Sequence, residues 1–264
     1  MLSQIHWHQP NAEVKVNPLE YLNFVRQYIQ WRNGRRMDAY IGEELDKRYE
    51  DYKTDPDSTK TKAVIDLVIQ AYVSHDEKKA LRPKLDPAFR LFAIRQIRLF
   101  FFTGHDSTSS TICYIIHLLS SNPESLAQLR KEHNRVFGPD QRHAATLLST
   151  KPQLIKSLPY TRAVIKESLR LFSPAASTRA GKPTVSLPSD VGTRLPTADA
   201  IILIIHVEMH RSPKYWLRPD DFVPERWLVG PEHELYPQRG AWRPFEHGPR
   251  NCIAQDLVLS LIHI

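Results

Sequence analysis

The feature that most constrains the fold is the stretch from Pro87 to about Ser121, which contains no further proline and one glycine. Its apolar residues keep helical spacing, so the sequence predicts one helix over about residues 87–121, longer than the usual three to four turns. Gly104 lies near the middle of this helix. Because an internal glycine costs about 1 kcal/mol relative to alanine, we expect a local bulge or groove there.

Amphipathic spacing and capping residues predict further helices on both sides of this stretch. Asn17 followed by Pro18 has the pattern of a helix start, and Gly34 is typical of a helix end. Pro174 stops the last of the predicted helices. Together these helices cover about residues 17–34, 38–52, 64–71, 123–138 and 159–172.

The texture of the sequence changes after the last of these helices. Residues 175–205 are rich in Pro, Thr, Val and Gly, which predicts a small sheet with Ala200–Ile205 as a buried strand. Closely spaced prolines over about residues 212–254 exclude long elements, yet aromatic side chains supply apolar anchors, so we expect an ordered meander. The predicted fold is mainly α with a small β-sheet, in one partial domain over residues 1–264.

The charge balance is basic, with 36 Lys and Arg against 29 Asp and Glu and a net charge of +7. Such a balance is compatible with a nucleic-acid partner. However, the basic residues are scattered, and the densest cluster, Arg32 to Arg36, lacks the periodic aromatics that stack on bases. We therefore expect a solvated basic surface and no nucleic-acid partner. A basic, helical nucleic-acid-binding protein remains an alternative, ranked behind the two that are given at the end of this section.

The cysteines and the apolar stretches of the sequence indicate where in the cell the protein is expected to reside. Cys113 and Cys252 are the two cysteines; they make no disulfide framework and have no CxxC partners, so reduced thiols inside a cell are expected. The longest aliphatic stretch, Ala200–Ile205, is far shorter than the roughly 20 apolar residues that cross a bilayer. Met1 opens no signal-peptide pattern. The chain as written is expected to be soluble.

Cys252 is the residue with the most distinctive surroundings. Gly248 permits a tight turn before it, and an apolar segment, 253–264, is predicted to form a helix directly after it. A helix start favours a thiolate, which is a soft metal ligand. Arg250 has the geometry to pair with a carboxylate of whatever the sulfur binds. By itself, a lone cysteine is more often an inert buried residue.

The run Phe245, Gly248, Arg250 and Cys252 resembles the heme-thiolate loop of the cytochrome P450 family. Three more matches stand upstream in the family's order: Thr103–Thr108, the pair Glu167 and Arg170, and Pro224–Trp227. The resemblance implies that Cys252 is the axial ligand of heme iron and that Phe245, Gly248 and Arg250 contribute to cofactor binding. It also implies a second contact to the heme propionates from Arg179.

The resemblance further implies a buried network of Glu167, Arg170 and Arg226 that fixes the meander beneath the heme. The alternative for a Glu–Arg pair three residues apart is a surface ion pair worth about 0.2 to 0.5 kcal/mol. Removing one member of a buried set typically costs about 3 to 5 kcal/mol.

Asp106, Ser107 and Thr108 bring an acid beside two hydroxyls in the long helix, next to Gly104. An acid and a hydroxyl can relay protons through ordered water to dioxygen as it is reduced. The sequence departs from the family pattern at Thr103, usually a small residue, and at Ser107, usually threonine, which puts the coupling of oxygen reduction to product formation in doubt. The alternative is that these hydroxyls bond the preceding helical turn.

A competing metal site is the segment from His206 to His210. On a helix the two histidines share a face, as zinc would need. However, Glu208 does not have the spacing of a zinc-protease glutamate, and no third ligand is evident. The resemblance instead places His210 near the heme edge or at the start of a short helix.

The resemblance runs from about residue 35 to the end of the chain and leaves the fold apparently truncated at both ends. It implies a heme b monooxygenase that inserts one atom of dioxygen into an apolar substrate, with electrons from NADPH through a reductase. Intact relatives would be anchored at the endoplasmic reticulum membrane, whereas no anchor is expected in this chain. The motif texture resembles filamentous-fungal members of secondary metabolism. The alternative is a non-catalytic fragment that retains the motifs.

Overall fold

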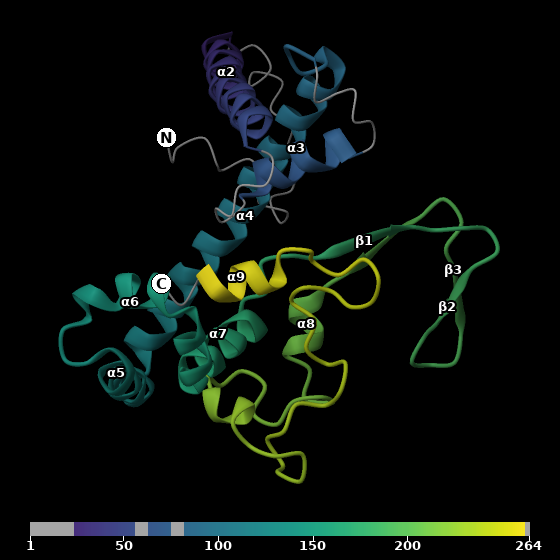
Figure 1. Ribbon diagram of the computed structural model, residues 1–264. Helices are drawn as coiled ribbons and strands as arrows, with labels where there is room; N and C mark the ends of the chain where they lie inside the picture. The colour runs from purple at the N-terminus through teal and green to yellow at the C-terminus, as the bar shows by residue number, and fades with distance from the viewer. Residues whose placement is uncertain (1–23, 56–62, 75–81, 262–264) are drawn as a thin grey trace. The chain divides into compact units, whose positions relative to one another are not determined.

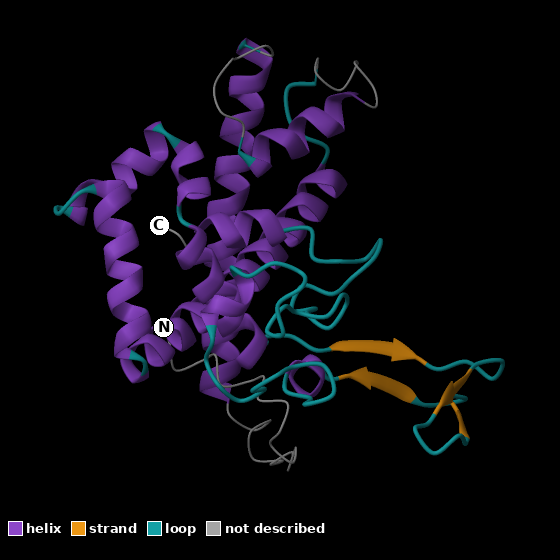
Figure 2. Ribbon diagram, turned by 90° about the horizontal axis from the view of Figure 1, so that it is seen from below, coloured by secondary structure: helices purple, strands orange, loops and turns teal. Residues whose placement is uncertain are grey.

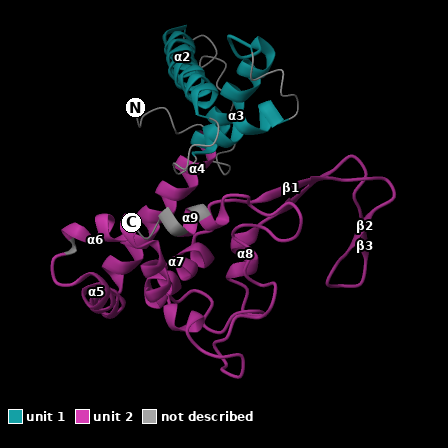
Figure 3. Cartoon of the chain, viewed as in Figure 1, with its two compact units in different colours: residues 1–101 teal, residues 102–264 magenta. Residues whose placement is uncertain are grey.

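The computed structural model describes residues 24–55, 63–74 and 82–261. Within these residues the fold is mainly helical with short antiparallel strands, as expected from the sequence (Figure 1). The chain divides into two compact units, residues 1–101 and 102–264 (Figure 3). The boundary lies inside helix α4 (Pro87–Ser121), the long helix predicted from the sequence.

The first unit contains α2 (Phe24–Thr54), α3 (Val64–Ser74) and the beginning of α4. Its core joins the three helices through buried apolar side chains, among them Leu45, Ile69 and Ala93. An ion pair between Arg98 Nη1 and Asp38 Oδ1, 2.9 Å apart, adds a polar tie between α2 and α4.

The predicted break between two helices at Gly34 is wrong, because α2 runs through this residue without interruption. A single glycine weakens a helix by only about 1 kcal/mol, and packing of one face of α2 outweighs that cost. The predicted start at Asn17 and Pro18 lies outside the described residues.

The second unit is built around α7 (Pro159–Leu171), ten of whose residues are buried. Glu132 of α5 (Pro123–Phe137) caps the first turn of α7, where it accepts from the backbone N–H groups of Tyr160 and Thr161 at 2.8 Å each. Tyr114 of α4 stacks on Phe172 with ring centroids 4.2 Å apart. Between α5 and α7 lie η3 (Gln141–His143), α6 (Ala144–Thr150) and η4 (Pro152–Ser157).

The strands form two separate antiparallel pairs instead of one sheet (Figure 2). β1 (Ser177–Ala180) pairs with β4 (Ile201–Ile204), with Ser177 opposite Ile204. β2 (Ser186–Pro188) pairs with β3 (Arg194–Pro196), and this hairpin extends away from the helices of its unit (Figures 1 and 2). The prediction of a buried strand at residues 200–205 is wrong, because Ile201 is 79% exposed.

The remaining chain of this unit holds α8 (His206–His210), the meander with one turn of 3-10 helix, η5 (Pro224–Trp227), and α9 (Gln255–Leu261). The prolines leave the meander without longer regular elements, as the sequence indicates. Its order comes from contacts with α7, which packs most extensively against η5.

Candidate functional site

The loop that carries Cys252 is closed by a hydrogen bond between its two ends. The backbone N–H of Cys252 donates to the carbonyl oxygen of Phe245 at 2.8 Å. Inside the loop, Asn251 N–H donates to the Gly248 carbonyl at 3.1 Å. Gly248 has φ +89°, a conformation that side chains rarely adopt, so the turn depends on glycine. The loop therefore presents Cys252 on a defined turn.

The thiol of Cys252 is free and exposed. Arg250 is also exposed and makes no hydrogen bond or ion pair with the residues that the structure describes. The predicted helix directly behind the cysteine is wrong in its start: α9 begins at Gln255, and Ile253 is 91% exposed in a turn. The sulfur thus stands at the end of a turn, three residues before the helix.

Glu167, Arg170 and Arg226 meet in one fully buried network. Arg170 of α7 donates twice to Glu167, from Nε to Oε2 at 3.0 Å and from Nη2 to Oε1 at 2.8 Å. Arg226 of η5 donates from Nε to Oε1 at 3.1 Å. Burial is the main cause that lowers the pKa of Arg226, and the Glu167 charge opposes it. All three side chains are 0% exposed, which excludes a surface ion pair.

The two guanidinium groups also bind backbone carbonyls of the meander. Arg170 donates to the carbonyls of His210, Pro219 and Asp221 at 2.5 to 2.9 Å. Arg226 donates to the carbonyls of Leu217 and Arg218 at 3.2 and 3.3 Å. This segment has no regular structure, so the arginines supply hydrogen bonds that a helix or sheet would otherwise provide.

Sequence reasoning missed the role of the tryptophans around this network. Trp227 Nε1–H donates to Glu167 Oε2 at 3.0 Å, and both arginines stack on the ring of Trp216. Trp242 anchors the loop to α7 by donating to the Lys166 carbonyl at 3.2 Å, and its ring meets Phe245 edge-on. The indole N–H in the Pro-Glu-Arg-Trp motif was the available signal, since a buried indole needs an acceptor.

A second polar cluster, His206, His210, Arg243 and Glu246, lies beside the loop. His210 is 0% exposed, and its Nε2 accepts from the Arg243 backbone N–H at 2.9 Å. Burial, together with His206 and Arg170, lowers the pKa of His210 to about 4. Among the described residues no group of three or more His, Cys, Asp and Glu has the arrangement of a metal site.

The acid and hydroxyls of α4 lie on consecutive residues, but no hydrogen bond between Asp106 and Ser107 is present in the described chain. Ser107 Oγ donates to the Thr103 carbonyl at 2.8 Å, one turn back. Thr108 Oγ1 is buried without a hydrogen-bond partner in the described residues. Among the described residues, no hydrogen bond joins Asp106, Ser107 or Thr108 to the Cys252 loop.

The expectation of a bulge at Gly104 is wrong, since α4 is regular there. The space beside Gly104 is open, because an added Cβ would meet no atom within 4 Å. Arg179 of β1 is half exposed, with its Nη2 3.8 Å from Glu246 Oε1. That contact places Arg179 beside the loop.

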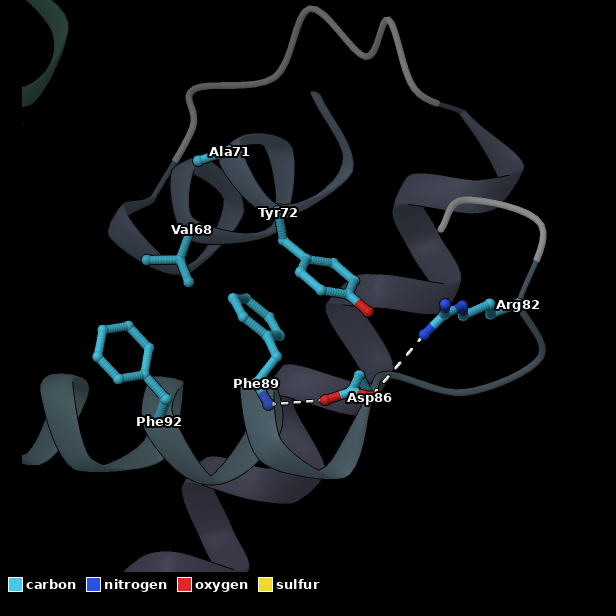
Figure 4. Close-up of a pocket in the computed structure, with 7 residues that line it drawn as sticks. All are labelled: Val68, Ala71, Tyr72, Arg82, Asp86, Phe89 and Phe92. Atoms are coloured by element: carbon cyan, nitrogen blue, oxygen red, sulfur yellow. Dashed lines mark hydrogen bonds and ion pairs between the residues drawn. The ribbon is translucent and has the colours of Figure 1, made fainter. Parts of the chain in front are cut away.

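One hollow of about 570 Å³ lies in the first unit (Figure 4). Phe89 points into it and stacks on Tyr72 with ring centroids 3.9 Å apart, while Arg82 and Asp86 supply the polar groups. None of the predicted site residues lines it.

Comparison with known proteins identifies the class to which this fold and loop belong. A model of the cytochrome P450 family matches residues 11–257. The chain therefore belongs to the cytochrome P450 family. No helix within residues 24–55, 63–74 and 82–261 is both long and apolar enough to cross a membrane.

Individual relatives are similar over much of this chain. Cytochrome P450 monooxygenase polC of Polytolypa hystricis is 39% identical over the whole chain, which corresponds to 47% of the relative. Cytochrome P450 monooxygenase acrF of Aspergillus aculeatus is 32% identical over 92% of this chain and 51% of its own length. Human cytochrome P450 4V2 is 34% identical over 77% of this chain and 35% of its own length. The chain thus spans about half the length of the first two relatives.

Proposed function

We propose that this chain contributes the thiolate side of a monooxygenase that inserts one atom of dioxygen into an apolar organic substrate. The observation that carries the proposal is the free, exposed thiol of Cys252 at the end of a closed loop that Trp242 anchors to α7. Membership of the family and the names of the relatives support it. The fungal relatives favour a role in secondary metabolism.

Heme b is the cofactor that suits the side chains around the loop. Cys252 offers a soft anionic ligand for iron, and the guanidinium groups of Arg250 and Arg179 are exposed and able to pair with propionates. When bound, heme with a thiolate ligand supplies the redox chemistry that activates dioxygen. In this proposal the electrons come from NADPH through a reductase, and the complete protein acts at the endoplasmic reticulum membrane.

Within the chain itself, Asp106, Ser107 and Thr108 hold and move protons. The Ser107 hydroxyl already donates to the preceding turn, so its oxygen is left to accept from water until the hydroxyl rotates. Thr108 Oγ1 is buried and has no partner in the described residues, so its capacity to bond a proton-carrying group is unused. The exposed carboxylate of Asp106 then exchanges protons with solvent.

The test is the carbon monoxide spectrum of the reduced, heme-loaded protein. We expect the red-shifted Soret band of a thiolate ligand, and we expect Cys252→Ser to abolish it because serine offers no soft anionic sulfur. Cys113→Ser is the matched control and should keep the band. A thiolate band that persists in Cys252→Ser would contradict the assignment of the ligand.

A further inference from the structure

Glu246 lies inside the Cys252 loop, directly after Phe245, and combines an unusual backbone conformation with a largely buried carboxylate. Its φ is +61°, in the left-handed region that residues with a Cβ rarely adopt. Its side chain is only 12% exposed, although it is a carboxylate. A strained backbone around a buried charge persists only where surrounding contacts hold it.

The carboxylate connects the loop to two other segments. Glu246 Oε2 accepts from Arg243 Nη2, three residues before it, at 2.5 Å and from the backbone N–H of the next residue, His247, at 3.2 Å. Glu246 Oε1 lies 3.3 Å from Nε2 of His206 on α8 and 3.8 Å from Nη2 of Arg179 on β1. One side chain therefore joins the loop to α8 and β1.

Two guanidinium groups, those of Arg179 and Arg243, lie beside the Glu246 carboxylate. His206 is 1% exposed, and its Nδ1 lies 3.0 Å from the Ala175 carbonyl oxygen, whereas its Nε2, which is near Glu246 Oε1, makes no hydrogen bond with the described residues. The Ser177 hydroxyl, followed by Arg243 and His206, lowers the pKa of Glu246 to about 2 against the effect of burial. Glu246 is therefore ionised at neutral pH. Without it, the basic groups around it would lose their counter-charge.

We propose that Glu246 is a positioning residue for the thiolate of Cys252. Its carboxylate fastens the start of the loop to α8 and β1, and so holds Phe245, whose carbonyl closes the loop onto Cys252, in place. Loss of the carboxylate would loosen the loop, and Cys252 would then be held less firmly where it could ligate heme iron. This inference rests on the proposed function of Cys252.

The experiment measures the ratio of thiolate to non-thiolate carbon monoxide complex in heme-loaded protein expressed from its complete gene. Two variants remove the charge: Glu246→Gln keeps the side-chain shape, and Glu246→Gly also relieves the left-handed backbone. We expect both to lower the ratio at least threefold while heme content and far-ultraviolet dichroism stay unchanged. Glu234→Gln, an exposed carboxylate in the same meander, is the matched control and should keep the wild-type ratio.

The outcomes separate this inference from the proposed function. A wild-type protein without the thiolate band defeats the proposed function, and the role of Glu246 falls with it. A wild-type band that either Glu246 variant retains at full ratio overturns the positioning role alone. Loss of folded protein in both variants also overturns it, because a positioning residue leaves the helical core intact.

Discussion

Replacing Glu167 by glutamine should destabilise the second unit more than any surface change. The two oxygens of this carboxylate accept from five donors: Arg170 Nε and Nη2, Arg226 Nε, Val223 N and Trp227 Nε1. Three of these donors bond Oε1 and two bond Oε2, so an amide in either orientation presents its NH₂ to at least two of them. The substitution also leaves two buried guanidinium groups without a counter-charge.

The expected cost is about 3 to 5 kcal/mol, the range for breaking a buried ion pair from one side. A loss of about 4 kcal/mol lowers the ratio of folded to unfolded protein roughly a thousandfold, since each 1.4 kcal/mol is a factor of ten. For a unit of this size, the midpoint of thermal unfolding should fall by roughly 8 to 16 °C, at about 2 to 4 °C per kcal/mol.

The assay is urea unfolding followed by tryptophan fluorescence and far-ultraviolet dichroism. The midpoint should shift while the slope stays constant, because the surface exposed on unfolding is unchanged. Glu234→Gln removes the same charge from an exposed site and should change the free energy of unfolding by less than about 0.5 kcal/mol.

A loss below about 1 kcal/mol in Glu167→Gln would refute the reasoning, because it would mean that water or rearrangement satisfies the stranded donors. A second check combines Glu167→Gln with Arg226→Met. The pair shares one hydrogen bond and one buried site, so the double variant should lose less than the sum of the two single losses.

Asp106→Asn and Ser107→Ala should leave heme content unchanged but divert electrons from product to hydrogen peroxide, measured as product formed per NADPH consumed; full coupling in both variants would end the relay proposal. The free energy of unfolding should decrease as pH falls from about 6.5 to 4. In this range His210 binds a proton in the unfolded chain, whereas the buried residue stays neutral in the folded protein because its pKa is about 4. His210→Gln should reduce this dependence and leave the contribution of His133, whose pKa burial also lowers, and the loss due to Glu246 below about pH 4.5; an unchanged slope would exclude His210 as a source. Residues 1–264 expressed alone should retain heme poorly, because apolar side chains of α4 such as Ile116 are exposed; full heme stoichiometry would contradict this.

The sequence predicts the long helices well, because their apolar periodicity and flanking prolines are local signals. Pro87 and Ser121 bound α4, and Pro159 opens α7, as those signals indicate. Gly34 misled the prediction, since helix packing overrides the weak propensity of one glycine. The strand at residues 201–204 reads as buried from its apolar run, but only a second layer of structure can bury it, and a run of residues does not reveal that layer.

Some residues of the candidate site could be predicted from the sequence, and others could not. Cys252, Gly248 and the Glu167–Arg170 pair stand out because their spacing within the chain is fixed. Glu246 gave no such signal, and His206 stood out only for its spacing to His210, because Glu246 and His206 meet across 40 positions of sequence and only the fold brings them together. Trp242 was visible as an aromatic anchor, yet its bond to the Lys166 carbonyl depends on how the meander returns to α7.

Within residues 217–221 of the meander, the arginines of the buried network bind backbone carbonyl oxygens. Every residue type carries a carbonyl, so these bonds do not distinguish one side chain from another at Leu217, Arg218 or Asp221. The residue that supplies the carbonyl should therefore tolerate substitution better than the arginine that donates to it. Random substitution should be accepted at the exposed Leu217 and Asp221 and rejected at Arg170 and Arg226, whereas the left-handed φ of +52° restricts Arg218. The stretch can therefore change part of its surface chemistry without changing its path.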